Sequence, residues 1–252
     1  MNININEIIE SYLALYPSHK QTNTSWKKPL VKVASAHNPA FQDFKKIVRE
    51  SHALPTDLLA EAESVITFFL PFGEGVAKSN VEGNLASHEW AVAYTETNTL
   101  IADISTFLIK YFETNGYLAA TVPATHNFDK ASLMSDWSHR HVAEIAGLGG
   151  FGLNNMLITE AGCCGRFGTV VTSAVIKPDI KEDKSFCLYH ANGTCGVCVD
   201  KCPKNAFGET YDRHKCYEMC LENDAYHETL GLVDVCGKCC VALPCSYKNP
   251  CK

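Results

Sequence analysis

The chain has 252 residues, a hydrophobic content of 46%, a charged content of 20% and a formal net charge of −6. These values are typical of a globular protein with one large domain, or with a medium domain and a small one, and the lack of any Lys/Arg run argues against a nucleic-acid partner. The amino terminus has no basic and apolar leader, and the longest apolar run, at 65–72, is too short to cross a bilayer. We therefore expect a cytoplasmic protein without a membrane segment.

The first 180 residues predict a mixed α/β fold. The run SVITFFLPF (64–72) is apolar and rich in aromatic residues, as in a buried strand. Between Ser87 and Asn115 the chain has no Pro or Gly, and its apolar residues recur at helical spacing, with Gly116 placed to cap a helix. We further expect strands at 116–124, 156–159 and 168–176, and a short helix at 138–147.

The composition changes after a charged stretch at 177–185. Residues 186–252 are rich in cysteine and lack a long hydrophobic period, so this segment cannot bury enough apolar surface to be stable alone. Bound metal clusters would supply the missing cross-links. We therefore predict two domains, 1–183 and 184–252, the second of which would be held together by bound metal clusters.

All but two of the thirteen cysteines lie in this second segment. Their odd number and the absence of a secretory signal favour metal ligation over a disulfide framework. Cys195, Cys198 and Cys202 follow the spacing C-x2-C-x3-C-P, which ends the cluster motif of bacterial ferredoxins. That motif would place a further cysteine at Asn192, so we assign its role to Cys187, the nearest cysteine upstream.

Two clusters need eight thiolates, and the second half of the segment supplies the rest. One cluster is predicted to use Cys187, Cys195, Cys198 and Cys245, and the other to use Cys202, Cys216, Cys236 and Cys239. Zinc also uses C-x2-C pairs, but the proline after Cys202 and the number of thiols favour iron–sulfur. The remaining cysteines are expected to be small buried side chains; they are Cys163, Cys164, Cys220, Cys240 and Cys251.

A glycine-dense region at 135–176 is the candidate pocket. Glycine lets the backbone approach a ligand closely, and the preceding SHRH (138–141) offers hydrogen-bond donors, a fixed charge and titratable rings. The stretch AGLGGFG matches a dinucleotide-binding G-x-G-x-x-G only loosely and does not open a helix after a strand. A Rossmann site is therefore disfavoured.

The segments AGLGGFGLNNMLIT (146–159) and RFGTVVTSAVI (166–176), followed by the cysteine pattern, resemble epoxyqueuosine reductases, relatives of the corrinoid-dependent reductive dehalogenases. The resemblance implies a nitroreductase-like α/β domain that carries cobalamin, with a two-[4Fe–4S] ferredoxin domain delivering electrons to cobalt. The glycine-rich loop would then line the corrinoid pocket. The predicted cofactor-binding residues are Ser138, His139, Arg140, Gly149, Gly150, Phe151, Gly152, Asn154 and Arg166.

The chain departs from this family at several positions. Gly150 and Leu153 stand where a tryptophan and a lysine are usual, and the family's proton-donating acid aligns with Leu133 unless the alignment is shifted by three residues to Asp136. Asp136 and Tyr94 are our proton-donor candidates. The alternative roles are a helix N-cap for the first and a core tyrosine for the second.

Three functions are compatible with these features. The first is a reductase that passes electrons through two clusters to a cobalamin-type cofactor or to a small substrate, and that takes them from a redox partner such as a ferredoxin or flavodoxin. The second is a non-catalytic electron carrier with a degenerate pocket. The third is an epoxyqueuosine reductase acting on tRNA, which the acidic composition and the motif losses weaken.

Overall fold

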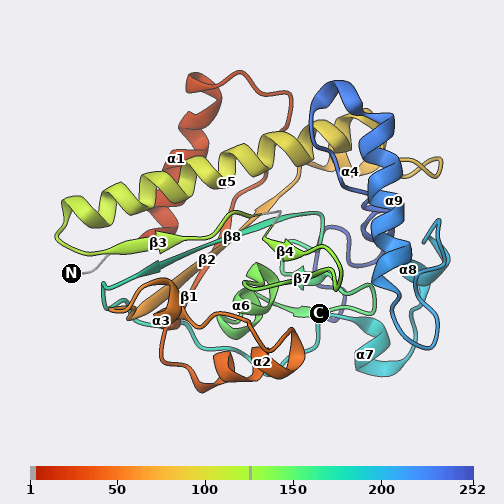
Figure 1. Ribbon diagram of the computed structural model, residues 1–252. Coiled ribbons are helices and arrows are strands. Elements are labelled where there is room, and N and C mark those ends of the chain that lie inside the picture. Colours follow the sequence, from red (N-terminus) through yellow and green to blue (C-terminus); the bar gives the residue numbers. More distant parts are fainter. Residues whose placement is uncertain (1–3, 125–126) are drawn as a thin grey trace.

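The computed structural model describes residues 4–124 and 127–252, and an antiparallel four-stranded sheet lies at its centre (Figure 1). The strand order is β1–β2–β8–β3, with β1 at Leu30–Ser35, β2 at Ser64–Pro71, β8 at Gly165–Thr172 and β3 at Ala119–Thr121. Every neighbouring pair in this sheet is antiparallel. The predicted mixed α/β class is therefore confirmed, and the parallel sheet of a Rossmann fold is not what this chain forms.

The central strand β2 is buried along its whole length, as its uninterrupted apolar sequence predicts. Phe69 pairs with Leu30 of β1 on one side and with Phe167 of β8 on the other. The rings of Phe69 and Phe167 stack with their centroids 4.5 Å apart. This strand joins both halves of the sheet, and helices cover both of its faces.

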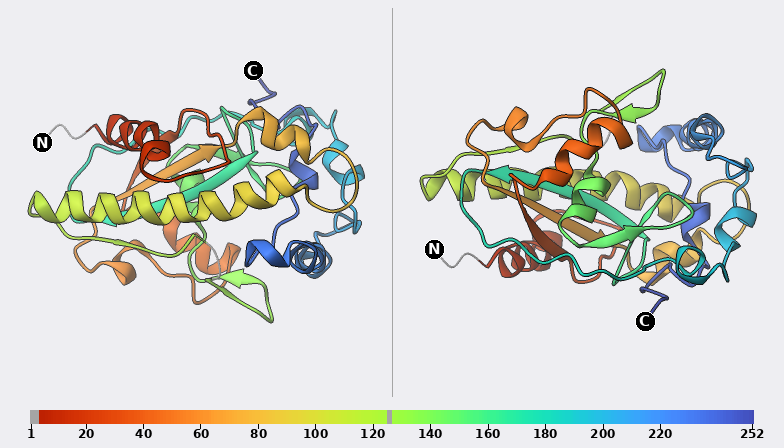
Figure 2. Two further views of the ribbon diagram at one scale, coloured as in Figure 1. Left: turned by 90° about the horizontal axis from the view of Figure 1, so that it is seen from above. Right: turned by 90° about the horizontal axis from the view of Figure 1, so that it is seen from below.

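Helices α1 (Ile5–His19) and α5 (His88–Thr114) cover one face of the sheet (Figure 2). The hydroxyl of Ser87 accepts from the backbone N–H of Trp90 and begins α5, and Gly116, at φ +82°, follows its end. The apolar side chains of α5 meet those of α1, β1 and β2 in the largest core cluster. The predicted long helix and its terminating glycine are therefore confirmed.

The opposite face is covered by shorter elements packed around Trp137. Its ring stacks on Phe41, and its indole N–H donates to Thr169 Oγ1 of β8 at 2.8 Å. The predicted helix at 138–147 is present as α6 (His139–Ile145). The other elements near this face are η1 (Pro39–Asp43), α2 (Phe44–Ile47) and α3 (Pro55–Leu58), and two hairpins complete the region: β4 (Phe128–Asp129) with β5 (Met134–Ser135), and β6 (Gly149–Phe151) with β7 (Leu157–Thr159).

The predicted strands differ from the observed ones mainly at their ends. The strand expected at 116–124 is reduced to the three residues of β3, and the strand expected at 168–176 begins earlier, at Gly165, and ends at Thr172. The extension of β8 follows from its pairing, because Gly165 lies opposite Pro71 at the end of β2. The strand expected at 156–159 is β7.

The cysteine-rich segment forms a cap at one end of the sheet, with little strand structure of its own (Figures 1 and 2). Its Phe186 and Val241 share a hydrophobic cluster with Trp90 and Ile158 of the α/β part. Its elements are α7 (Leu188–Asn192), α8 (Val197–Asp200), α9 (Arg213–Tyr226), η2 (Glu228–Leu230) and η3 (Lys238–Cys240), and a further short helix, α4 (Glu74–Ser79), precedes α5. In the described part of the chain, no helix has the length and apolar character to cross a membrane.

Candidate functional site

Four thiols predicted to bind one cluster gather around a small cavity; we call Cys187, Cys195, Cys198 and Cys245 the first thiol set. Cys187 is the N-cap residue of α7, and Cys198 lies in α8. Burial and the nearby thiols of the other three raise the pKa of Cys198 to about 12. Since crowding several thiolates without a cation is unfavourable, the arrangement suits a bound metal centre.

The α/β part fixes the position of Cys245. The N–H of Cys163 donates to the carbonyl of Cys245 at 3.0 Å, and the N–H of Cys164 donates to the carbonyl of Ser246 at 3.3 Å. The Ser246 hydroxyl in turn donates to the carbonyl of Cys240 at 2.7 Å. Residues 163–164 therefore hold the backbone at Cys245 and at the residue that follows it.

The second thiol set, Cys202, Cys216, Cys236 and Cys239, lines a much larger cavity. Burial, together with the nearby thiols of Cys216, Cys240 and Cys202, raises the pKa of Cys236 to about 12. Cys216 projects from α9, and Cys220, one turn along, is in hydrogen-bond contact with it. The structure thus brings each predicted set of four together, while their ligation of iron stays a prediction.

The thiols of each set line a cavity and do not surround a single position at which one metal ion could bind. Among residues 4–124 and 127–252, no group of three or more Cys, His, Asp or Glu side chains surrounds a position for a single metal ion. A zinc site needs its ligands about 2.0–2.3 Å from one ion, whereas the thiolates of a cubane each bind a different iron. The zinc alternative therefore gains no support from this geometry.

The large cavity has a volume of about 740 Å³ and is lined by residues of the α/β part, such as Phe72 and Arg166, and of the cysteine-rich cap, such as Cys216 and Asp234. This volume is within the range of small-molecule pockets, roughly 300–1,000 Å³. Aromatic side chains form much of its wall; they are Phe44, Phe72, Trp90, Tyr94, Phe128, Phe151, Phe207, Tyr211 and Tyr217.

The charges in this wall are mostly positive, although the whole chain is acidic. Arg140, Arg166, Lys204 and Arg213 line the cavity together with the acids Glu144 and Asp234. The Arg166 guanidinium lies 4.4 Å from the centre of the Tyr94 ring, and its Nε has no hydrogen-bond acceptor among the described residues. Burial lowers the pKa of Arg166 from its ordinary value.

Tyr94, a predicted proton donor, lies in the wall of this cavity. Its hydroxyl donates to Asp234 Oδ1 at 2.5 Å, in a link between α5 and the cysteine-rich cap. Sequence reasoning missed Asp234, because no motif marks an acid two residues before Cys236. The contact between Asp234 and Tyr94 forms only when the cysteine-rich cap packs against α5, and local sequence patterns do not predict such packing.

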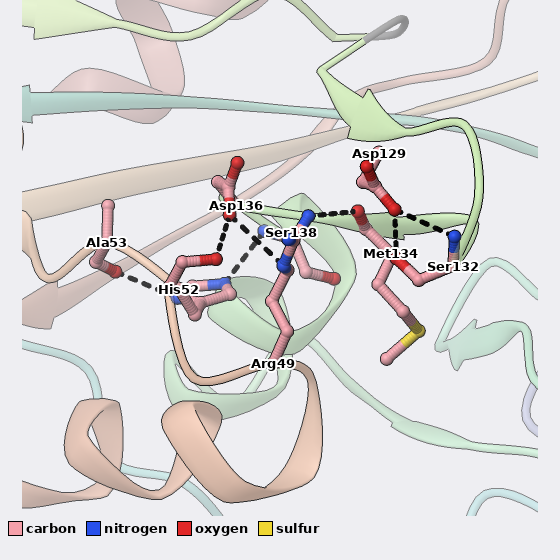
Figure 3. A network of polar contacts seen from close by, with 9 residues as sticks. Arg49, His52, Ala53, Asp129, Ser132, Met134, Asp136 and Ser138 are labelled. Carbon is pink, nitrogen blue, oxygen red and sulfur yellow. Dashed lines mark hydrogen bonds and ion pairs between the residues drawn. The ribbon is translucent and has the colours of Figure 1, made fainter.

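Asp136, the other proton-donor candidate, is not among the residues that line the large cavity. Its carboxylate accepts from Ser51 Oγ at 2.6 Å and pairs with Arg49 Nε at 3.3 Å (Figure 3). Its carbonyl accepts from the N–H of Ala53 at 2.8 Å. The N-cap of α6 is Ser138 and not Asp136, so the alternative role considered for Asp136 is wrong.

The predicted cofactor-binding residues fall into two groups. Ser138, Arg140, Phe151 and Arg166 line the large cavity, and Asn154 lines the small one. Asn154 donates to the carbonyl of Cys239 at 2.7 Å and so connects the two parts of the chain. The others, His139, Gly149, Gly150 and Gly152, line neither cavity.

The three glycines permit close packing within the protein. A Cβ on Gly149 would lie 2.2 Å from the carbonyl oxygen of Ile158, and a Cβ on Gly150 would lie 3.0 Å from the Phe186 ring. A Cβ on Gly152 would lie 2.7 Å from the Ile158 side chain. The glycine-dense loop therefore lets β7 and the cysteine-rich cap approach β6 closely, which explains its composition without a ligand.

His139 is a buried structural histidine with a testable pH effect. Its Nε2–H donates to the Pro123 carbonyl at 3.1 Å, and its Nδ1 lies 2.9 Å from the Thr169 hydroxyl. Burial lowers the pKa of His139 to about 4. Because the unfolded histidine titrates near 6.5, the unfolded state binds more protons between these values, and stability is lost as the pH falls through this window.

We expect the free energy of unfolding to decrease by about 1 kcal/mol between pH 7.5 and 5.5 through His139 alone. Urea unfolding at the two pH values measures the change, and His139→Gln should reduce it. An equal pH dependence in the variant would contradict the role given to this histidine.

No family model matches the chain, and no curated protein matches its sequence. Solved structures do match: an epoxyqueuosine reductase from Bacillus subtilis has a TM-score of 0.58 at 15% identity, covering 97% of this chain and 67% of that one. An epoxyqueuosine reductase solved with a modified tRNA-Tyr stem loop has a TM-score of 0.57 at 16% identity, with 96% and 66% covered. The catabolic reductive dehalogenase NpRdhA, in complex with 3-bromo-4-hydroxybenzoic acid, has a TM-score of 0.60 at 17% identity, with 87% and 30% covered.

At these identities the likeness establishes the fold. The chain spans about two thirds of the length of the epoxyqueuosine reductases that it matches and less than a third of the dehalogenase. The resemblance noted in the glycine-rich and cysteine-rich segments thus agrees with the three-dimensional comparison. The chain has the fold shared by epoxyqueuosine reductases and corrinoid reductive dehalogenases.

Proposed function

We propose that this protein is a reductase in which two [4Fe–4S] clusters pass electrons to a group held in the large cavity. In this proposal residues 1–183 form a nitroreductase-like pocket domain, and residues 184–252 form a two-cluster ferredoxin domain. One observation carries this proposal. The four thiols of the second set line the same cavity as Arg166 and Tyr94. A cluster held by these thiols would therefore give its electron to a group in this cavity directly.

The positions of the two thiol sets support one order of electron flow. The first set lies around its own small cavity, and the second set faces the large one. A ferredoxin or flavodoxin would reduce the first cluster, which would reduce the second. A non-catalytic electron carrier has no need of a large cavity with a cationic and aromatic wall, and for this reason we favour the enzyme.

The large cavity suits a cobalamin-type cofactor in its charge. Arg140, Arg166, Lys204 and Arg213 would hold an anionic group such as the phosphodiester of a corrinoid. The corrinoid would supply the cobalt at which the difficult chemistry takes place, and the protein would supply binding and proton delivery. A substrate that took electrons directly from the second cluster would bind against the same residues.

Tyr94 is the proton donor that the geometry favours. It lies in the cavity wall, and the guanidinium of Arg166 over its ring would stabilise the tyrosinate left after the hydroxyl gives up its proton. In this structure the hydroxyl donates its one proton to Asp234, so it would have to turn from Asp234 to the bound group to deliver that proton. Asp136 would have to leave Arg49 and Ser51 to reach the cavity; in one Bacillus subtilis epoxyqueuosine reductase structure the catalytic aspartate loop is swung out of the active site.

Cobalamin binding to the cluster-loaded protein tests this function. The protein would be reconstituted without oxygen, its iron and sulfide measured, and cobalamin added while the corrinoid absorption is followed. We expect saturable binding that weakens roughly tenfold or more in Arg166→Gln, since a charge-assisted hydrogen bond contributes about 1.5–3 kcal/mol. Arg49→Gln is the matched control, because Arg49 does not line the cavity.

The outcomes separate the alternatives. Full clusters with no change in the corrinoid spectrum would exclude the cofactor and leave direct reduction of a substrate, or the electron carrier. The sequence argued against nucleic acid, but one structural neighbour was solved with a tRNA stem loop. A tRNA-binding measurement at several salt concentrations therefore belongs in the same series, since phosphate contacts weaken as salt increases.

A further inference from the structure

One histidine in the wall of the large cavity, His141, has no part in the proposed function. Its Nδ1 lies 2.7 Å from the Ser138 hydroxyl oxygen, and both residues line the cavity. Ser138 is the N-cap residue of α6, and His141 follows it by three residues in the first turn of that helix. The Ser138 oxygen makes no capping bond to the helix backbone, so its hydroxyl is directed to the histidine ring.

The backbone of Ser138 is held by a second histidine, His52, which is fully buried (Figure 3). The N–H of Ser138 donates to His52 Nε2 at 3.0 Å, so this nitrogen carries no hydrogen. The hydrogen of the His52 ring therefore lies on Nδ1, which donates it to the Ala53 carbonyl at 2.8 Å. Burial lowers the pKa of His52, in agreement with the neutral ring that these bonds require. Ser138 is thus fixed in place beside His141.

The number of hydrogens decides the tautomer of His141. The Ser138 hydroxyl has one hydrogen, the residue is 8% exposed, and His141 Nδ1 is the partner of this hydroxyl in the described part of the chain. The hydroxyl therefore donates to Nδ1. Burial, together with Arg140 and His52, lowers the pKa of His141 to about 4, so the ring is neutral at pH 7. A neutral ring that accepts at Nδ1 carries its hydrogen on Nε2.

The Nε2 atom of His141 is open to the cavity. It has no hydrogen-bond partner among residues 4–124 and 127–252, and it is not one of the buried polar atoms that are closed off there without a partner. The ring contacts Phe44 and Phe151, whose ring centres lie 5.4 and 4.6 Å from its own. A neutral donor among aromatic rings suits an uncharged oxygen, whereas the arginines of the same wall suit an anionic one.

We propose that His141 donates its Nε2–H to an uncharged oxygen, such as an amide carbonyl, of the group bound in the large cavity. Ser138 is then a positioning residue, because it fixes the tautomer that presents this donor. The amide side chains of a corrinoid carry oxygens of this kind. The inference rests on the proposed function, since it adds a contact with the same bound group.

Nitrogen magnetic resonance of protein labelled at histidine tests the tautomer. The full chain is reconstituted, its clusters are kept oxidised, and substitutions assign the signals of His52 and His141. At pH 7 we expect His52 to carry its hydrogen on Nδ1 and His141 to carry it on Nε2. Ser138→Ala should mix the two tautomers of His141, and Ser138→Thr, which keeps the hydroxyl, should not. A charged His141, or one with its hydrogen on Nδ1, would overturn the inference.

Cobalamin binding tests the contact itself. His141→Phe keeps the ring contacts and loses the donor, so cobalamin should bind roughly fivefold more weakly, as expected for one neutral hydrogen bond. His141→Gln places an amide N–H near the position of Nε2 and should recover most of the affinity. His139→Gln is the matched control, because both ring nitrogens of His139 already have partners within the protein and the residue lines neither cavity.

The outcomes separate this inference from the proposed function. Equal affinity in the wild type and in His141→Phe, both with full clusters, would overturn the inference alone. A wild-type protein with full clusters that binds no cobalamin would refute the proposed cofactor, and the inference with it. If His141→Phe does not fold, Ser138→Ala decides: it should weaken binding by a smaller factor, and unchanged binding with unchanged nitrogen signals would refute the role of the pair.

Discussion

Replacing Cys245 with alanine should remove about half of the iron from the reconstituted protein, and replacing Cys202 should remove the other half. Cys245 lies beside the N-terminal cysteines of the segment, because its thiol is close to that of Cys198. Cys202, although it follows Cys198 by only four residues, lies near Cys236 and faces the large cavity. In the predicted assignment the two sites would therefore exchange ligands, each taking cysteines from both ends of the segment.

Double substitutions make this prediction sharper. Cys202→Ala combined with Cys245→Ala should remove nearly all of the iron, whereas Cys202→Ala combined with Cys239→Ala should remove no more than either alone, because both thiols belong to the second set. Cys251→Ala is the control, as Cys251 belongs to neither set and lines neither cavity. Iron and acid-labile sulfide per chain are the measurements. A normal iron content in Cys245→Ala would refute the exchange of ligands.

The proximity of Cys245 to the first set shows what spacing can predict and what it cannot. The spacing C-x2-C-x3-C-P identified Cys195, Cys198 and Cys202 directly, and counting to eight thiolates required Cys245. The reason Cys245 reaches the first set lies elsewhere in the chain. It is held by the backbone of residues 163–164, which belong to the α/β part.

Helix α9 and Asp234 were missed for a related reason. The sequence of α9, RHKCYEMCLENDAY, has no apolar stripe, so a search for helical periodicity does not find it. Its buried Asn223 instead binds the backbone of Ala86 in the other part of the chain. In contrast, α5 and β2 are buried in an apolar core, and their patterns predicted them well.

The glycine-dense loop was interpreted correctly as a place of close approach but with the wrong neighbour in mind. Gly149 and Gly152 lie against Ile158, and Gly150 lies against Phe186 of the cysteine-rich cap. A cluster of glycines in a sequence predicts a close contact with the backbone, but it does not show whether the contact is with a ligand or with another part of the protein. Arg166 and Tyr94, both among the predicted site residues, do line the large cavity, but they come from β8 and α5 and not from the glycine-dense loop.

Gly162→Ala should release Cys245 from the first thiol set and remove about half of the iron. Gly162 has φ +82°, and a Cβ there would lie 2.3 Å from the carbonyl oxygen of Ser246. Neither backbone can yield easily, since Cys163 and Cys164 form hydrogen bonds with residues 245 and 246. The alanine must therefore push the tail, and Cys245 with it, away from Cys198.

Gly116→Ala separates this effect from backbone strain. Gly116 has the same φ of +82°, but a Cβ there would have no atom within 4 Å, and the residue lies at the end of α5, away from both thiol sets. The substitution should lower the free energy of unfolding by about 1–2 kcal/mol through strain alone and leave the iron content unchanged. Gly162→Ala should be less stable than this control and retain only the second cluster, measured as iron per chain and by paramagnetic resonance. Full iron in Gly162→Ala would show that the contact with Ser246 does not position Cys245, because strain without loss of a ligand is what the control already measures.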